Sequence, residues 1–375
     1  MSPKLAVTSL RVKNFKAVHD TGVLKPEPLT VFIGDNGTGK SSVLEALRFA
    51  RELALGTLDE ALAPFGGYEH LRWKGGAQLG RVTPEAPLKE YHPVEITVRG
   101  HTGRVRVRAT TRITGQNKNE VVFEHEELKV GAETSGRDPE EDRSWRAGRS
   151  IFSRTRWFDD WQFLDLVPGR MGQPVKRTQT GAAVRLLPDG SNLAEYILDL
   201  RSVPERGVDA FNGLIEALRV ILPYARDIET VMREIFGREV ALMLREGSFT
   251  VPGWMLSTGT LRLIALLALL RHPKPPSLLC IEEIENGLDP RTIHLVLDEI
   301  LRATTKGRTQ VMLTTHSPYF LDLVPLGSLV LVSREEGQPP RFTRPADSEA
   351  VQAWAKRFAP GQLYVTGTFH RGTGE

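Results

Sequence analysis

The sequence has one cysteine and no long apolar run. With Cys280 alone among 375 residues, an internal disulfide framework and a cysteine-rich zinc site are excluded. The apolar neighbours of Cys280 predict a small core residue. The longest apolar stretch, Leu263–Leu270, is far shorter than the ~20 residues of a membrane-spanning helix. The N-terminus also lacks the apolar core of a secretory signal. We therefore expect a cytoplasmic protein with no membrane partner.

An excess of charge of either sign is also missing. The formal net charge is +3, with 49 basic and 46 acidic residues. Basic residues cluster at 99–112 and 143–156, where they could meet phosphates. A solvated surface with scattered counter-charges explains each cluster more simply. Charge alone therefore does not indicate nucleic-acid binding. The chain also has no internal repeat and no heptad run long enough for a coiled coil.

The chain does contain a glycine-rich segment with the pattern of a phosphate-binding loop, between a predicted strand and a predicted helix. The segment Gly34-Asp-Asn-Gly-Thr-Gly-Lys-Ser, residues 34–41, fits G-x-x-x-x-G-K-[ST] at every fixed position. The apolar run Leu29–Ile33 before it predicts a buried parallel strand. Apolar residues recur at helical spacing from Ser41 to Leu53. A glycine-rich turn that matches by chance would lack this strand and this helix.

Each residue type in the loop has a chemical reason. Gly34, Gly37 and Gly39 let the backbone turn tightly and bring N–H groups close to an anion. Lys40 is placed to neutralise the outer phosphates of a nucleotide, and the Ser41 hydroxyl to bind Mg²⁺. The helix N-terminus adds its positive dipole end. The predicted nucleotide-binding set also includes Asn36, Thr38 and Ser42.

A second motif places two carboxylates after a buried strand. The strand is Ser277–Ile281, and Glu282 and Glu283 follow it. Parallel strands deliver such residues to one edge of a sheet. We expect Glu282 to help hold Mg²⁺, through water, and Glu283 to orient or deprotonate an attacking water. An ordinary acidic strand end is the alternative, and the phosphate loop elsewhere in the chain makes it the weaker one.

Two further signals depend more on their context. Ser257 and Gly259 directly precede a predicted helix at 260–271, where a hydroxyl and backbone amides could meet an anion. Ser257 could equally be a plain N-cap. His316 follows the buried strand Thr309–Thr315 and is placed to sense a terminal phosphate. A lone histidine is usually structural, but this position favours a function.

The remaining pattern predicts an α/β fold with an inserted middle region, because strands and helices alternate at both ends of the chain. Alternating segments predict an antiparallel meander at 94–99, 104–113 and 119–130, and residues 4–13 predict an exposed edge strand. Helical spacing is found at 193–201, 208–222 and 227–236, with Ser191 or Asn192 as an N-cap. Residues 131–150 predict a mobile surface loop, and 239–251 alternate as a strand does.

Taken in order, these motifs resemble the ATPase head shared by ABC-type, SMC, RecF and OLD-like proteins, and most of all the stand-alone RecF/OLD-like ATPases. The segments that carry the resemblance are Gly34–Ser41, Leu256–Thr260, Leu278–Glu283, Asn286–Pro290 and His316. The resemblance implies a P-loop NTPase with an ABC/RecF-like head, in which a mainly parallel core sheet accompanies the antiparallel meander. It implies the ranges 1–130 and 251–345 as the two halves of the head, 131–250 as a partly helical insertion and 346–375 as a short tail.

The resemblance also implies a mechanism. In such heads two subunits enclose two ATP molecules, so that Ser257 and Gly259 of one subunit contact the γ-phosphate bound by the other, with Asp289 across the interface. The opening residues Asn14, Phe15 and Lys16 correspond to the segment that approaches adenine. We therefore expect a homodimer that forms around Mg²⁺–ATP and separates after hydrolysis.

Some features depart from the family pattern. Glu282 stands where these heads usually have aspartate, and its extra methylene changes the strict Mg²⁺ geometry, so hydrolysis is expected to be slow. Thr260 replaces the glutamine of transporter signatures. Gln78 is the nearest candidate for a metal-assisting glutamine. The chain has no coiled coil of the SMC type. Too few residues follow His316 for the Toprim nuclease domain of OLD proteins. We therefore expect any nuclease or toxin effector to be a separate protein.

Three functions remain open. The first is an ATP-hydrolysing, DNA-associated switch in repair or anti-phage defence. The second is an ATP-gated scaffold that controls a separate effector and never binds DNA. The third is the nucleotide-binding subunit of a membrane transporter, which the signature Ser257–Thr260 and the large middle insertion disfavour. The DNA role depends on family analogy, which is a weak basis for function.

Overall fold

The computed structural model describes residues 4–369, apart from 75–91, 118–119, 138–147, 178–183, 205 and 234–237. The chain forms two compact units. Unit 1 comprises Met1–Trp161, Met312–Pro318 and Val324–Glu375, and unit 2 comprises Gln162–Val311 and Tyr319–Leu323. Within the described ranges, no helix combines the length and the apolar character needed to cross a membrane. The four ranges that the motifs imply (1–130, 131–250, 251–345 and 346–375) stay a prediction. The two units are defined by how compactly the chain packs, which is a different criterion from the order of the motifs.

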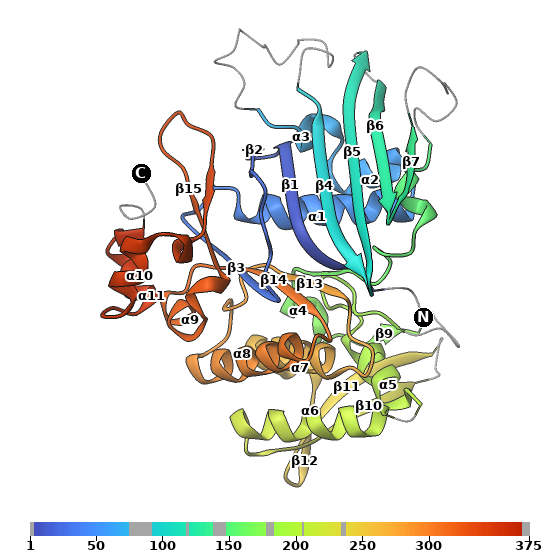
Figure 1. The fold of residues 1–375 in the computed structure, drawn as a ribbon. Helices are drawn as coiled ribbons and strands as arrows, with labels where there is room; N and C mark the ends of the chain where they lie inside the picture. The colour runs from blue at the N-terminus through green and yellow to red at the C-terminus, as the bar shows by residue number, and fades with distance from the viewer. Residues whose placement is uncertain are drawn as a thin grey trace. The chain divides into compact units, whose positions relative to one another are not determined.

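Unit 1 contains the antiparallel sheet, and Figure 1 shows its strands side by side with α1 (Lys40–Leu55) packed against β1. The strand order is β2-β1-β4-β5-β6-β7, and every neighbouring pair is antiparallel. The strands are β1 (Ala6–Phe15), β2 (Val18–Asp20), β4 (Val94–Thr102), β5 (Val105–Asn117), β6 (Glu120–Val130) and β7 (Glu133–Arg137).

The meander predicted from alternation is therefore confirmed, with two corrections around it. The sequence predicts a mobile loop at 131–150, but residues 133–137 form β7 and pair with β6. The first strand was expected at an exposed edge, but β1 pairs with β4 along its length and with β2 at its end. In β7 and in β1, hydrogen bonds to a neighbouring strand determine the conformation, and the local amino-acid composition does not predict this pairing.

A second sheet of unit 1 carries the phosphate loop. Four consecutive strands of this six-stranded sheet run in the order β16-β15-β3-β14. Here β3 is Leu29–Ile33, β14 is Gln310–Thr315, β15 is Leu329–Ser333 and β16 is Arg341–Thr343. All five residues of β3 are buried, and β3 pairs with β15 in parallel, as the sequence predicts. Short helices complete the unit: α2 (Leu58–Leu62), α3 (Tyr68–Leu71), α10 (Glu349–Ala355) and α11 (Pro360–Val365).

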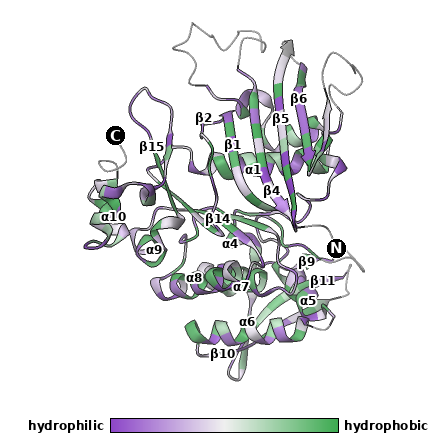
Figure 2. Ribbon diagram, viewed as in Figure 1, coloured by the Kyte–Doolittle hydropathy of each residue, from purple (hydrophilic) through white to green (hydrophobic). Residues whose placement is uncertain are grey.

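Unit 2 is built around α7 (Thr258–Arg271), whose residues 261–270 are all buried. Figure 2 shows this helix as largely apolar, which is typical of a helix surrounded by other elements. Its neighbours include α6 (Gly207–Ile221), α8 (Pro290–Thr305) and α5 (Leu193–Ser202). The parallel pair β8 (Gln162–Leu164) and β13 (Leu278–Ile281) ends in the acidic residues, and Cys280 is buried in β13.

An antiparallel sheet also belongs to unit 2 and corrects one expectation. It contains β9 (Val175–Lys176), β10 (Ala225–Arg233), β11 (Glu239–Glu246) and β12 (Phe249–Pro252). Helical spacing at 227–236 predicted a helix, but its described part is strand β10, paired with β11. Asn192 occupies the N-cap position of α5, yet its side chain bonds Leu187 and Arg185 instead of the helix.

The remaining helical segments are short. They are α4 (Pro168–Met171), α9 (Pro318–Leu323) and the 3₁₀ turns Ala63–Phe65, Ile151–Arg154, Gly253–Met255, Leu326–Ser328 and Pro345–Asp347.

Candidate functional site

The phosphate loop joins β3 to α1 in the way an anion site requires. Gly34, Gly37 and Gly39 have φ values of 152°, 75° and 102°, which side chains other than glycine rarely allow. Gly39 is the N-cap of α1 and offers no side chain to the first helical amides. The first turn of α1 also carries no acidic residue. The positive end of a 16-residue helix is thus left for an external anion.

Lys40 lies folded along this loop. Its side chain is buried, and Nζ donates to the carbonyl oxygens of Gly34 and Asp35, each at 2.7 Å. Thr38 is also buried, and its Oγ1 donates to the Asp35 carbonyl at 2.8 Å. Asn36 is exposed at the tip of the loop, Ser41 is half-buried, and Ser42 is buried in α1. The ammonium of Lys40 is therefore held beside the loop backbone, where a phosphate would lie.

The opening segment expected beside adenine has an unusual backbone. Asn14 and Lys16 have φ values of 54° and 48°, which is uncommon for residues with a side chain. Phe15 between them is fully buried and packs against the rings of Phe49 and Phe65, so its ring is a core element with no exposed face. Lys16 forms an ion pair with Glu45 of α1. The predicted contact with a nucleotide therefore depends on Asn14 and Lys16.

Two other residues of unit 1 lie on elements that adjoin the loop. His316 is half-buried and directly follows β14, the neighbour of β3 in the sheet order. Tyr364 of α11 donates its hydroxyl to Asp35 Oδ1 at 3.4 Å. Partial burial and the nearby Asp35 carboxylate raise the pKa of Tyr364 to about 12, so the phenol stays protonated. The sequence offered no signal for Tyr364, because Tyr364 lies 329 positions from Asp35 in the chain.

In unit 2 the acidic pair lies at the end of the parallel strands. The Glu282 backbone N–H donates to the Leu164 carbonyl at 3.2 Å, which extends the pairing of β13 with β8. Glu283 has a φ of 45° and is the one residue with a side chain and positive φ among the described residues of unit 2. Such a conformation costs of order 1 kcal/mol, and it is often found where a side chain must be aimed at a reaction.

The signature segment packs directly on the loop that follows the acidic pair. A Cβ on Gly259 would lie 2.6 Å from the Gly287 carbonyl oxygen, so only glycine permits this approach. Ser257 is the N-cap of α7, and its Oγ accepts from the Thr260 N–H at 3.1 Å. The plain capping role considered for Ser257 is therefore present. Ser257 is also exposed, so it remains accessible to a ligand or a partner.

Arg262 connects these two segments and was missed by sequence reasoning. Its guanidinium donates to the carbonyls of Asn286 and Leu166, the latter at 3.1 Å. Burial lowers the pKa of Arg262, while Asp165, Glu283 and Glu285 act in the opposite direction. Arg262 also lines a small pocket with Glu282 and Glu283. It thus fixes the signature helix and the acidic loop to each other.

Asp289 lies at the end of that loop and caps α8. Its carboxylate accepts from the backbone N–H of Arg291 at 3.0 Å and of Thr292 at 3.2 Å. The Thr292 hydroxyl also donates to it, and this bond is the main reason that the pKa of Asp289 is lowered. The capping bonds hold the residue expected at a subunit interface in one orientation.

The structure therefore gathers the predicted residues into two groups. The loop 34–42, the opening 14–16 and His316 belong to unit 1, whereas Ser257, Gly259, Glu282, Glu283 and Asp289 belong to unit 2. Gln78 lies outside the described residues. Ser41 and Glu282 offer a hydroxyl and a carboxylate, which are oxygen ligands of the kind Mg²⁺ prefers. Each of the two side chains, taken by itself, is thus of a kind that can bind a magnesium ion.

Comparison with known proteins agrees with this geometry. The structure is similar to an SMC head bound to the C-terminal winged-helix domain of ScpA, with a TM-score of 0.57 and 14% identity over 90% of this chain and 96% of that one. It is equally similar to the Smc head domain from Pyrococcus furiosus with an extended coiled coil, bound to the C-terminal domain of ScpA, with a TM-score of 0.57 and 12% identity over 94% of this chain and 100% of that one. At such identities the likeness shows the fold. A search of curated protein sequences found no match.

The fold is thus that of an ABC-type P-loop ATPase head, and the α/β prediction is confirmed. Residues 29–322 match the family described as "AAA domain, putative AbiEii toxin, Type IV TA system", and the chain belongs to this family. The resemblance seen in the motifs is therefore confirmed at the level of an ABC/RecF/SMC-like ATPase head of the nucleotide-binding class.

Proposed function

We propose that the protein binds and hydrolyses ATP with Mg²⁺, and that two copies enclose the nucleotide. The observation that carries this proposal is the complete phosphate loop between β3 and α1, with Lys40 buried against it in a chain of the AAA family. Hydrolysis needs a positioned water and charge neutralisation on the phosphates, because the reaction involves little covalent chemistry from the protein.

The proposed catalytic residues have distinct roles. Glu283 orients the attacking water and accepts its proton, and its unusual φ supports a side chain aimed for that purpose. His316 contacts the γ-phosphate and responds to its presence. Ser41 and Glu282 are the proposed magnesium ligands, Glu282 through water, with Gln78 as a third candidate. When bound, Mg²⁺ would neutralise charge on the phosphate oxygens. The longer side chain of Glu282 makes slow turnover the expected result.

The proposed dimer uses the exposed signature. Ser257 and Gly259 of one copy would meet the γ-phosphate held by Lys40 of the other, with Asp289 near the shared interface. The two residues just before the signature, Trp254 and Met255, have 43% and 69% of their surfaces exposed. Exposed large apolar side chains beside polar contact residues are typical of protein interfaces. This exposure supports a partner surface at the signature.

The biological role divides into two candidates. The first is a DNA-associated switch in repair or anti-phage defence, and the second is a scaffold that gates a separate toxin or nuclease without DNA. In the first basic cluster, Arg108 pairs with Glu127, and Arg112 pairs with Glu95 and Glu124, which reduces the positive charge offered to DNA. The family description mentions a toxin–antitoxin system, and the SMC heads are bound to protein domains, which supports a protein partner.

The decisive experiment is the molar mass of Glu283→Gln in solution, with and without Mg²⁺–ATP, measured by light scattering. We expect a monomer that becomes a dimer with ATP, because binding is kept while hydrolysis is slowed. A mass that does not change with ATP would contradict the enclosed-nucleotide mechanism. Hydrolysis by Glu283→Gln at the parent rate would contradict the assignment of Glu283.

Two variants separate the steps of this mechanism. Lys40→Ala should lose ATP affinity by ~10- to 100-fold, since a hydrogen bond to a charged group contributes about 1.5–3 kcal/mol. Ser257→Arg should bind ATP as a monomer but fail to dimerise. Ser248→Arg is its matched control, because Ser248 is exposed in the turn between β11 and β12. A further run with duplex DNA distinguishes the two biological candidates, since only the first expects a salt-dependent shift.

A further inference from the structure

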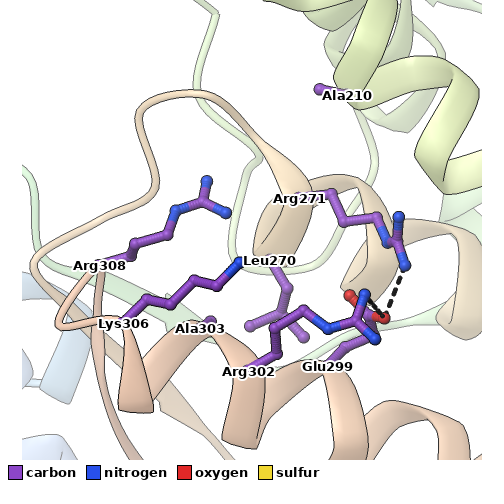
Figure 3. Close-up of a pocket in the computed structure, with 8 residues that line it drawn as sticks. All are labelled: Ala210, Leu270, Arg271, Glu299, Arg302, Ala303, Lys306 and Arg308. Carbon is purple, nitrogen blue, oxygen red and sulfur yellow. Dashed lines mark hydrogen bonds and ion pairs between the residues drawn. The ribbon is translucent and has the colours of Figure 1, made fainter.

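A basic pocket in unit 2 lies outside the proposed nucleotide site. Its cavity of about 210 Å³ is lined by four cationic side chains: Arg271, Arg302, Lys306 and Arg308. They come from the end of α7, the last turns of α8 and the segment after it. Figure 3 shows them arranged around Leu270, with one carboxylate, Glu299, among them. None of these residues was singled out by a sequence motif.

The carboxylate already has partners. Glu299 is buried, and its Oε1 accepts from Arg271 Nη2 at 2.7 Å and lies 3.3 Å from Arg302 Nη1. Figure 3 shows both interactions as dashed lines. Arg271 can lie this close to α6 because Gly213 leaves room, since a Cβ there would be 2.5 Å from Arg271 Nη1. The Arg271–Glu299 pair is therefore a structural element at the floor of the pocket.

The pocket still carries excess positive charge. The lining holds four cations and one carboxylate, and one of the cations, Arg308, also donates to the His272 carbonyl. The C-terminal ends of α7 and α8 add about half a negative charge each. The pocket lining and the two helix ends together thus carry a net positive charge of about two. In addition, Arg271 Nε is buried and donates to no protein atom within the described ranges. Like charges held together repel each other, and an anionic ligand would relieve this repulsion.

We propose that this pocket binds a phosphoryl group. Its volume is below the ~300–1,000 Å³ of pockets that enclose a whole small molecule, so a charged head group enters while the rest of the ligand stays outside. Arginine side chains present forked donors that match phosphate oxygens, and Lys306 adds a point charge. The phosphoryl group can belong to a nucleic-acid backbone or to a free phosphate compound. The site is distinct from the phosphate loop, since the two share no residue.

The test uses the Lys40→Ala background, in which binding of phosphate at the phosphate loop is expected to be weaker. Arg302→Gln with Lys306→Gln removes two charges from the rim and leaves the Arg271–Glu299 pair intact. Lys356→Gln, an exposed lysine at the end of α10, is the matched control. Pyrophosphate binding is measured by calorimetry, and binding of a 20-base-pair duplex by fluorescence anisotropy at several salt concentrations. If the double variant unfolds, Lys306→Gln alone replaces it.

The outcomes separate the two sources of phosphate. Weaker pyrophosphate binding by about tenfold or more, with unchanged DNA binding, identifies a free phosphate compound. Weaker DNA binding with a salt slope reduced by roughly 2 identifies a nucleic-acid backbone. If the pocket variant binds both probes as the Lys356→Gln control does, the proposal is wrong. When Lys40 is intact, the pocket variant and the Lys356→Gln variant should bind ATP with the same affinity, because neither change lies in the phosphate loop. If the parent protein does not bind ATP, the proposed function is wrong, but the pyrophosphate and DNA measurements still test the pocket.

Discussion

Gly34 and Gly37 both lie in the phosphate loop, but their surroundings differ. A Cβ on Gly34 would lie 2.0 Å from the Val332 carbonyl oxygen, whereas a Cβ on Gly37 would meet nothing within 4 Å. We therefore expect Gly34→Ala to destabilise the fold by about 3–5 kcal/mol, from backbone strain and a collision with β15. Gly37→Ala should cost only the strain, about 1–2 kcal/mol.

Urea unfolding followed by circular dichroism checks this pair. Both substitutions alter the phosphate loop, so nucleotide binding cannot separate them, but the free energy of unfolding can. Equal losses in the two variants would mean that the contact between Gly34 and β15 does not constrain the loop. A larger loss at Gly34 would show that the nucleotide site is positioned by the neighbouring strand as well as by its own sequence.

Residues differ in how far the sequence reveals their roles. The loop 34–41 is predictable because its chemistry requires fixed residues at fixed local spacing. The role of Arg262 is not predictable, because its hydrogen-bond partners Leu166 and Asn286 are 96 and 24 positions away. The residues next to Arg262 in the sequence do not indicate that its side chain binds two carbonyl groups. Tyr364 escaped prediction for the same reason. Phe15 was expected beside a nucleotide from its motif position; its ring is buried in the core, and its contact with a nucleotide stays a prediction.

At the scale of elements, α8 begins at a residue with two possible roles. Asp289 caps the helix through the amides of Arg291 and Thr292 and is also proposed to lie near the dimer interface. Without nucleotide only the first role acts. Asp289→Ala should therefore lower the stability of the nucleotide-free protein by about 1 kcal/mol, the usual cost of losing an aspartate cap.

This cost should depend on pH in a defined direction. The pKa of Asp289 is lowered in the folded protein, chiefly by the Thr292 hydroxyl, so its contribution is present above the ordinary value of 3.8. As the pH falls through the lower folded value, the carboxylate is protonated and the contribution is lost. Urea titrations from pH 7 down to about 3 should show the two proteins converging. Asp298→Ala, which removes an exposed carboxylate from the same helix away from its N-cap, is the matched control.

Elements were predictable where one pattern dominated. The buried strands β3 and β13 and the helices α1 and α7 follow from apolar runs or helical spacing bounded by clear breaks. Strand β10 shows the limit. Ile228, Val231 and Met232 have helical spacing, yet Val231 and Met232 are 41% and 48% exposed and the segment pairs with β11. Long-range pairing overrode the local preference, which no reading of one segment can foresee.

At the scale of the whole molecule, the proposed activity requires residues from both units and from two copies of the chain. The phosphate loop with His316 belongs to one unit, and the acidic pair with the signature belongs to the other. A monomer would therefore bind ATP but lack the signature contact that the family resemblance assigns to the second copy. On the proposed mechanism, dimerisation would control hydrolysis, because it would complete the set of groups around the γ-phosphate.

Trp254 offers the sharpest test of that interface. It is 43% exposed and lies three residues before Ser257, so a second copy that contacts the signature would bury it. Buried tryptophans often dominate the energy of an interface. In the Glu283→Gln background with Mg²⁺–ATP, Trp254→Ser should raise the dimer dissociation constant by about tenfold or more, as measured by sedimentation equilibrium.

The control for this prediction is Tyr224→Ser, which removes an aromatic side chain of similar exposure, 51%, from the turn before β10. It should leave the dissociation constant within about twofold, because the proposal assigns no interface to that turn. ATP affinity of the monomer should be the same in both variants, since Trp254 belongs to the unit without the phosphate loop. If both aromatic substitutions weaken the dimer equally, the interface is not centred on the signature, and the ATP-enclosing arrangement would have to be abandoned for another mode of association.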